Sequence, residues 1–78
     1  MQVVSSEMTE TTFSITIDGD NVDFDNSYML DLEDNVIEAA EYIAETNTIV
    51  FPYTPSEYNI FVYAKNGKCI HLLLVPHK

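Results

Sequence analysis

Residues 58–75 read YNIFVYAKNGKCIHLLLV, two apolar runs on either side of Lys65-Asn66-Gly67-Lys68. Asn-Gly suits the left-handed backbone of a type I′ turn, so the stretch predicts a β-hairpin whose two-residue loop is Asn66 and Gly67. In that register the predicted cross-strand pairs are Ala64 with Cys69, Val62 with His71, Ile60 with Leu73 and Tyr58 with Val75. A β-sheet is therefore the centre of the predicted fold.

The other face of this hairpin is apolar as well. It carries Phe61, Tyr63, Ile70, Leu72 and Leu74 in the predicted register. A chain with one predicted helix can cover only one face of a sheet. We therefore interpret the face with Phe61, Tyr63, Ile70 and Leu72 as an interface, either with a partner or with a second copy in a homodimer.

Further strands are predicted on the N-terminal side of the hairpin. Residues 11–18 alternate, with Phe13, Ile15 and Ile17 on one face, as in a half-buried strand. Gly19, Asp20 and Asn21 are turn formers, and residues 22–30 resume the alternation, which predicts a second hairpin. Residues 48–53 are β-branched and aromatic, but Pro52 cannot donate a ladder hydrogen bond, so they predict an edge strand.

Residues 31–47 predict the one helix. Asp31 resembles an N-cap, with a further acid, Asp34, in the first turn. An apolar stripe follows at i, i+3, i+4 and i+7, formed by Val36, Ile37, Ala40, Ile43 and Ala44. The predicted fold class is α+β, in the order β-β-α-β-β-β, with a small antiparallel sheet of about five strands and the helix packed on one face.

Length and composition limit the possible organisation of the chain. Its 78 residues support a single domain, 1–78, in which residues 1–10 show no period and are predicted to be a loose arm or a short edge strand. With 46% hydrophobic residues the chain has enough apolar side chains to fold. The lone Cys69, the absence of a secretory leader pattern and the absence of an apolar run of about 20 residues predict a soluble protein of the cytoplasm, the host cytoplasm if a phage encodes it.

Charge indicates the class of partner. Thirteen acids face three lysines and no arginine, for a formal net charge of −10. Phosphates and anionic lipids are bound by lysine and arginine, so direct binding to nucleic acid or to a membrane is disfavoured. A basic protein is the complementary partner.

Two groups of acids are the candidate partner-binding residues. On the predicted helix, the spacing i, i+4, i+7, i+11 places Asp34, Glu38, Glu41 and Glu45 in one line opposite the apolar stripe, about 4.5 to 6 Å apart along the axis. That spacing is comparable with the spacing of phosphates along a nucleic acid. No lysine or arginine on the predicted helix neutralises the charge of these acids. The second group is Asp18, Asp20, Asp23 and Asp25 around the first predicted hairpin. The alternative interpretation is a solvated acidic surface with no partner.

Metal and catalytic sites are weaker alternatives. Residues 23–34 place acids with calcium-loop spacing, but Tyr28 stands where such a loop needs glycine, and Asp34 where a glutamate is usual. Cys69 and His71, with His77 nearby, lack the further ligands of a zinc site and an orienting third catalytic group. We predict no cofactor, no metal and no enzymatic activity.

In size, acidity and predicted α+β fold, the chain resembles the small acidic inhibitors encoded by bacteriophages, including anti-CRISPR proteins and other nucleic-acid mimics. The resemblance lies in composition. It implies that the acids occupy the basic channel of a nucleic-acid-binding or processing protein and exclude its substrate. One alternative is an immunity or antitoxin protein for a cationic nuclease toxin. Another is a structural or oligomerisation module that acts through its apolar hairpin.

Overall fold

A computed structural model describes residues 1–75 of the chain. They form eight strands and one 3-10 turn, so the predicted α+β fold with a packed helix is wrong. The strands are β1 (Gln2–Met8), β2 (Thr12–Asp18), β3 (Tyr28–Leu30), β4 (Val36–Glu38), β5 (Glu41–Ile43), β6 (Thr48–Pro52), β7 (Tyr58–Tyr63) and β8 (Cys69–Leu74), with the 3-10 turn η1 (Phe24–Asn26) before β3. No helix in this part of the chain is long and apolar enough to cross a membrane.

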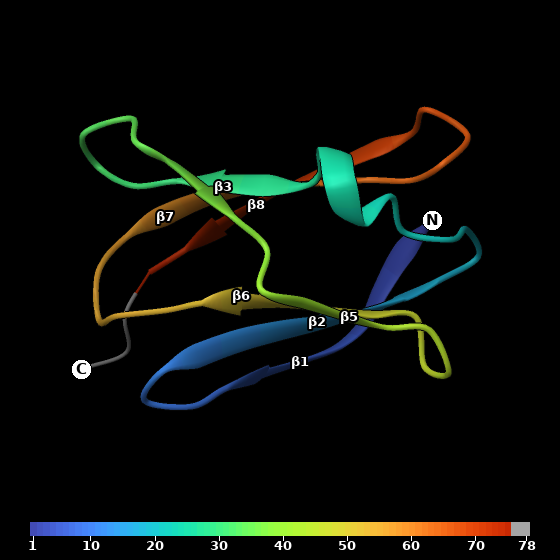
Figure 1. Ribbon diagram of the computed structural model, residues 1–78, viewed down its shortest axis with the longest axis horizontal. Helices are drawn as coiled ribbons and strands as arrows, with labels where there is room; N and C mark the ends of the chain where they lie inside the picture. Colours follow the sequence, from blue (N-terminus) through green and yellow to red (C-terminus); the bar gives the residue numbers. More distant parts are fainter. Residues whose placement is uncertain (76–78) are drawn as a thin grey trace.

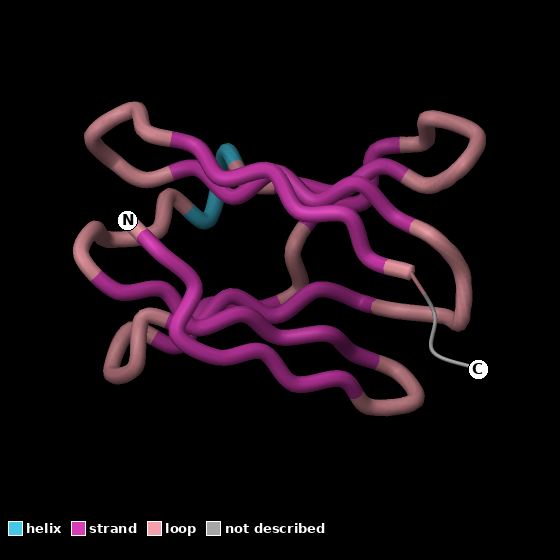
Figure 2. The backbone as a smooth tube through the Cα atoms, turned by 180° about the vertical axis from the view of Figure 1, so that it is seen from behind, coloured by secondary structure: helices cyan, strands magenta, loops and turns pink. Residues whose placement is uncertain are grey.

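The strands form two antiparallel sheets that lie face to face (Figure 1). Sheet I has the order β1-β2-β6-β5, and sheet II has the order β4-β3-β7-β8. Successive strands pair as hairpins that alternate between the sheets, and β2–β6 and β3–β7 join the hairpins within each sheet. Figure 2 shows the two layers from behind, with connections passing between them. The architecture is a small β-sandwich.

The core lies between the two sheets. The predicted inward alternation of Phe13, Ile15 and Ile17 on β2 is confirmed. Fully buried side chains come from both layers: Ile15, Val22, Met29, Ile49, Phe51, Ile60 and Val62. The predicted pairing of residues 11–18 with residues 22–30 is wrong, because β3 lies in the opposite sheet and pairs with β4 and β7.

The segment predicted to be helical instead crosses from one sheet to the other. β4 pairs with β3 and β5 pairs with β6, and Ala39 and Ala40 form the corner between them; the green ribbon descends here between the layers in Figure 1. The Ala40 N–H donates to the Val50 carbonyl over 2.7 Å. Ile37 and Tyr42 both pack against the core, each from its own sheet. Of the predicted apolar stripe only Ile37 packs against the core, together with Tyr42, whereas Val36, Ala40 and Ala44 are exposed. Strand pairing also avoids aligning the unpaired acids at repelling i, i+4 positions.

Asp31 does not cap a helix. Its Oδ1 accepts hydrogen bonds from the backbone N–H groups of Glu33 and Asn35, both over 2.9 Å, within the β3–β4 loop. Asp34 in the same loop has φ +63°. An aspartate that opens a tight turn binds the same kind of backbone donors as an N-cap aspartate, so the local sequence signal fits either structure.

The β7–β8 hairpin forms, but its register differs by one residue from the prediction. Ala64 N–H donates to the Lys68 carbonyl (2.8 Å) and Gly67, at φ +90°, donates to the Ala64 carbonyl (3.0 Å). The loop therefore has three residues and ends in a left-handed glycine, the usual alternative to a two-residue turn. The observed pairs include Tyr58–Leu74, Ile60–Leu72 and Val62–Ile70. A one-residue shift moves every β8 side chain to the opposite face.

Two other strand predictions concern residues 1–10 and 48–53. Of the two alternatives for residues 1–10, a loose arm or a short edge strand, the structure has the edge strand: β1 covers residues 2–8, and all of its residues are exposed. Residues 48–52 form β6, which lies between β2 and β5 and not at an edge. Pro52 is tolerated because Val50 and Pro52 face the β5 side, and β5 ends its pairing at Val50.

Candidate protein-binding surfaces

The predicted acidic line on a helix face does not exist. Asp34 lies in the β3–β4 loop and Glu45 in the β5–β6 turn. Glu38 lies opposite Tyr28 on the outer face of sheet II, whereas Glu41 lies opposite Val50 on the outer face of sheet I. Glu38 and Glu41 thus lie on either side of the corner between β4 and β5. The acids follow an edge from one layer to the other.

Tertiary contacts bring some acids of the two predicted groups together. Asp18, Asp20 and Glu45 share a hollow of about 420 Å³ that Asn47 also lines. Asp25 and Glu38 share a smaller one, of about 100 Å³, with Phe24 and Ala39. We call the exposed carboxylates along this part of the molecule the acidic edge: Asp18, Asp25, Glu38, Glu41 and Glu45.

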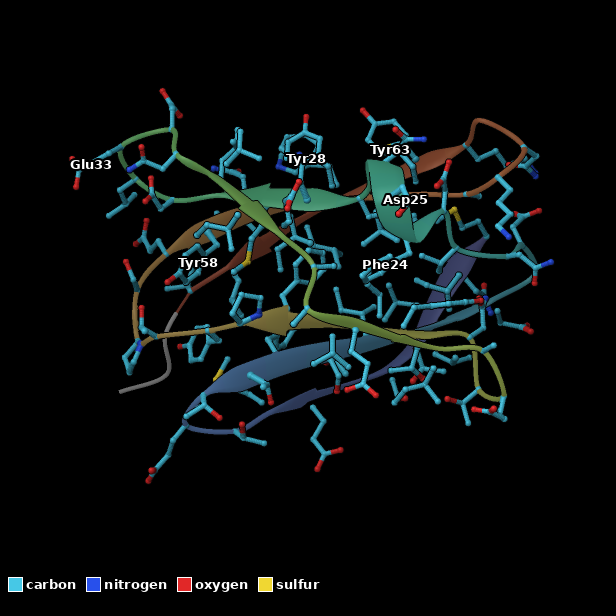
Figure 3. The ribbon with its side chains drawn as sticks, viewed as in Figure 1. Phe24, Asp25, Tyr28, Glu33, Tyr58 and Tyr63 are labelled. Atoms are coloured by element: carbon cyan, nitrogen blue, oxygen red, sulfur yellow. The ribbon has the colours of Figure 1, made fainter. Side chains whose placement is uncertain are left out.

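Asp34 and its neighbour Glu33 lie apart from the acidic edge. Figure 3 shows Glu33 at the far end of sheet II from Asp25. Asp23 lies beside η1, where its Oδ2 accepts a hydrogen bond from Asn26 Nδ2 over 2.6 Å. Asp34 and Asp23 therefore do not join the acidic edge.

The Asp20 carboxylate makes ionic and hydrogen-bond contacts within the chain. Its carboxylate lies 3.0 Å from the N-terminal amine and 3.9 Å from Lys68 Nζ, and it accepts a hydrogen bond from Asn66 Nδ2 over 2.7 Å. The hydrogen bond from the N-terminal amine, helped by the charge of Lys68, lowers the pKa of Asp20 below its ordinary value. Asp20 is the only carboxylate with an ion pair within residues 1–75. It holds loops together, while the acids of the acidic edge remain without cations there.

Asn47 is a site residue that sequence reasoning missed. It has φ +53°, and its Oδ1 accepts hydrogen bonds from Val22 N–H (3.1 Å) and from the Tyr42 hydroxyl (2.6 Å). Its Nδ2 donates to the carbonyls of Ile17 (3.0 Å) and Asp20 (2.7 Å). One side chain thus fixes the β5–β6 turn, which carries Glu45, against the loop that follows Asp18. The only sequence signal is an asparagine between two threonines, typical of a left-handed turn position.

A row of aromatic rings crosses the outer face of sheet II. Successive strands place Glu38, Tyr28, Phe61 and His71 opposite one another. The ring centroids are 5.2 Å apart for Tyr28–Phe61 and 4.6 Å apart for Phe61–His71, with interplanar angles of 26° and 3°. Figure 3 shows Tyr28 and Tyr63 pointing away from sheet I. Because neighbouring rings cover each other's faces, the row offers mainly ring edges to solvent and is a poor platform for stacking bases.

The four residues of the predicted apolar interface do not share a face. Phe61 and Tyr63 are half-buried on the outer face, as the hairpin pattern predicted. Ile70 and Leu72 instead pack against the core, because of the register shift. Their places on the outer face are taken by Cys69, His71 and Leu73.

Within residues 1–75, the candidate metal ligands of the sequence do not come together. Asp23 and Asp34 flank β3 at opposite ends, so no calcium loop forms. No cluster of three or more potential metal ligands occurs among the residues that the structure describes. His71 stacks on Phe61, and its Nε2 lies 2.9 Å from Asn59 Oδ1. His77 lies outside the described residues.

A hollow of about 560 Å³ lies over the outer face of sheet I. It is lined mostly by hydroxyl side chains, with Glu7 as its one carboxylate. The hydroxyls of Thr16 and Thr48 lie 2.8 Å apart, as do those of Thr46 and Thr48. These side chains bond to one another, and no basic side chain lines the hollow to activate a hydroxyl as a nucleophile.

Comparisons with protein-family models, with curated proteins and with solved structures gave no match.

Proposed function

We propose that this protein binds a basic nucleic-acid-binding or nucleic-acid-processing protein and inhibits it by occupying its basic surface. The carboxylates of the acidic edge, which have no cation beside them within residues 1–75, support this proposal best. A nucleic-acid channel attracts phosphates through lysine and arginine, and the same side chains bind carboxylates.

Long-range attraction favours such a complex. The chain carries a net charge of −10, and Asp20 alone of its acids is neutralised in the described part of the chain. Charges within about 8 Å act together at physiological salt, so neighbouring acids such as Asp25 and Glu38 reinforce each other. Opposite charge accelerates association by about 10 to 1,000-fold. The complex should therefore form quickly and weaken as salt rises.

The shape of the acidic edge determines which partner surface fits. Its carboxylates come from the end of β2, from η1, from the edge strands β4 and β5 and from the β5–β6 turn, and they continue around the corner at Ala39 and Ala40. A basic groove that closes over a strand edge fits this arrangement better than a flat basic patch. The competing explanation is that Glu38 and Glu41 only prevent strand edges from pairing with other chains. The two explanations differ in what charge reversal should do.

The test compares two charge-reversed variants of equal net charge. Glu38→Lys with Glu41→Lys alters the acidic edge, and Glu10→Lys with Glu57→Lys alters two exposed acids in loops elsewhere. Both variants should fold, because lysine also protects a strand edge and because Glu10 and Glu57 are exposed in loops. Tagged wild-type protein would capture partners from a bacterial lysate, followed by elution along a salt gradient and affinity measurement with the purified partner.

We expect a nucleic-acid-binding protein that elutes at moderate salt and that nucleic acid displaces. At low salt, the Glu38 and Glu41 variant should bind it at least about tenfold more weakly, while the Glu10 and Glu57 variant should change the affinity little. An equal loss of affinity in both variants would contradict a role for the acidic edge. Unchanged affinity in the folded Glu38 and Glu41 variant would contradict the proposal. Capture of one dedicated cationic nuclease, with rescue of cells from it, would identify an immunity protein instead.

A further inference from the structure

β8 is an edge strand of sheet II, with no neighbour on its outer side within residues 1–75. The Ala64 N–H donates to the Lys68 carbonyl, and the Tyr63 carbonyl accepts from the Asp23 N–H on the opposite side of β7. Backbone groups alternate in direction along a strand, so Val62 and Ile60 face β8, and Ile70 and Leu72 face β7 in return. The N–H and C=O groups of Cys69, His71 and Leu73 therefore point away from the sheet. Within residues 1–75 no backbone group pairs with them.

This edge lacks the protection that the other three edges have. Strand edges usually carry charges, prolines or bulges that prevent pairing with another chain. β4 carries Glu38, β5 carries Glu41, and β1 carries Glu7 and an irregular register between Val3 and Ser5. β8 reads CIHLLL from Cys69 to Leu74 and has no charged residue, proline or bulge. An uncharged six-residue edge is a surface suited to strand addition.

We propose that β8 pairs antiparallel with β8 of a second copy around a two-fold axis at His71. In this register His71 lies opposite the same residue of the second copy, and Cys69 lies opposite Leu73. The backbone N–H groups of Cys69, His71 and Leu73 in each copy then donate hydrogen bonds to the other copy, and their C=O groups accept hydrogen bonds from it. The two copies of sheet II become one continuous sheet, which is a closed, self-complementary arrangement.

Side chains on the outer face support the same register. The row of rings from Tyr28 through Phe61 ends at His71, which stacks on Phe61 at 4.6 Å and is exposed beyond it. Adjacent strands lie about 4.8 Å apart, so the second copy's imidazole would continue the stack. Leu73, which is 64% exposed, would lie over the strand of the second copy.

Charge favours a second copy over a basic partner at this edge. β8 has no carboxylate to attract a cationic surface. Glu38 on β4 lies three strand spacings away from β8, about 14 Å, which exceeds the Debye length of about 8 Å at physiological salt. Two copies joined at β8 thus keep these carboxylates apart despite the net charge of −10. The acidic edges remain free on the outer ends of the joined sheet.

The first test compares Leu73→Lys with Val36→Lys by analytical ultracentrifugation under reducing conditions. Leu73 and Val36 are matched, because they lie on the outer face of sheet II, on opposite edge strands, and are 64% and 65% exposed. The wild-type protein should sediment as a dimer at micromolar concentration. Leu73→Lys should raise the dimer dissociation constant at least about tenfold, because a charged lysine on a strand edge opposes pairing with another strand. Val36→Lys should leave it within about twofold.

A monomeric wild-type protein, or an equal effect of both lysines, would overturn the proposal. Amide hydrogen exchange of the wild-type protein makes the same test without substitution. Cys69, His71 and Leu73 should gain protection as the protein concentration rises, whereas a free edge would exchange at a rate independent of concentration.

Disulfide cross-linking tests the register. In a Cys69→Ser background, His71→Cys should form an intermolecular disulfide, because residues opposite each other in a paired edge have Cα atoms about 5.5 Å apart. Leu73→Cys in the same background should not cross-link, but Leu73→Cys with Cys69 retained should. The reverse pattern would exclude a two-fold axis at His71.

Discussion

Asn47 shows how much of this fold depends on single polar side chains. Its amide contacts two segments that are far apart in the sequence, at Ile17 and Asp20 on one side and Tyr42 on the other. A small sandwich buries limited apolar surface, so each satisfied polar group between its layers matters for stability. Asn47 links the loop that follows Asp18 to the turn that carries Glu45.

Asn47→Ala should lower the free energy of unfolding by about 2 to 3 kcal/mol, because it leaves the Val22 N–H and two carbonyls without their partner. Urea unfolding at fixed protein concentration measures the loss. Asn66→Ala is the matched control, since Asn66 is also a turn asparagine with side-chain hydrogen bonds but is exposed. It should cost about 1 kcal/mol or less. A smaller loss in Asn47→Ala than in the control would show that the Asn47 contacts do not stabilise the fold.

At the scale of elements, the β7–β8 turn sets the register of the last hairpin. Gly67→Ala should lower the free energy of unfolding by about 1 to 2 kcal/mol, because position 67 has φ +90°. The loss would be conformational and not steric, since no atom lies within 4 Å of an added Cβ. Thermal and urea unfolding check this prediction.

The same measurement distinguishes the two loop types. A two-residue type I′ loop needs positive φ at both Asn66 and Gly67, so alanine would be costly at both positions. In the observed three-residue loop Asn66 does not have positive φ, so only Gly67→Ala carries the conformational penalty. Equal losses in the free energy of unfolding for Asn66→Ala and Gly67→Ala would instead support the two-residue loop, in which Ala64 pairs with Cys69.

Sequence patterns predicted elements well where a local period decided the structure. The alternation of Phe13, Ile15 and Ile17 and the existence of the last hairpin were both visible, because each depends on neighbouring residues. The loop length was not, since Asn-Gly suits both turn types. The helix prediction failed because Ile37 and Tyr42 face the core from different sheets, and strand pairing with β3 and β6 outweighs a local helical period.

The candidate site was predictable only in its chemistry. Acidity is a property of the sequence, but the approach of Asp25 to Glu38 and of Asp18 to Glu45 depends on the sandwich. Likewise, no local pattern indicates that Asp20 is paired with the N-terminal amine. Residue types therefore indicated a basic partner, and the fold defines which carboxylates could face it.

For the whole molecule, unpaired negative charge opposes folding. The free energy of unfolding should rise, on the order of 1 kcal/mol, when NaCl increases from about 10 mM to about 1 M, because the Debye length falls from about 30 to about 3 Å. Urea titration at fixed protein concentration measures the gain. Glu38→Gln with Glu41→Gln removes two of the exposed charges and should reduce the gain. Stability that decreases with salt would contradict net repulsion.

The alternation of hairpins between the layers has a consequence for how the chain folds. Each sheet is completed by pairs between distant residues, such as Thr16 with Thr48, which are 32 positions apart, and Ser27 with Tyr63, which are 36 apart. Hairpins form in about 1 to 10 μs. Folding is slower, because the entropic cost of closing long loops comes before the central strand pairs can form and stabilise the sheets. During synthesis on the ribosome, neither layer can close before β6 and β7 emerge. The nascent N-terminal half, including β1 to β4, then exposes unpaired edges and apolar faces, and its abundant carboxylates would keep it from aggregating until the rest of the chain arrives.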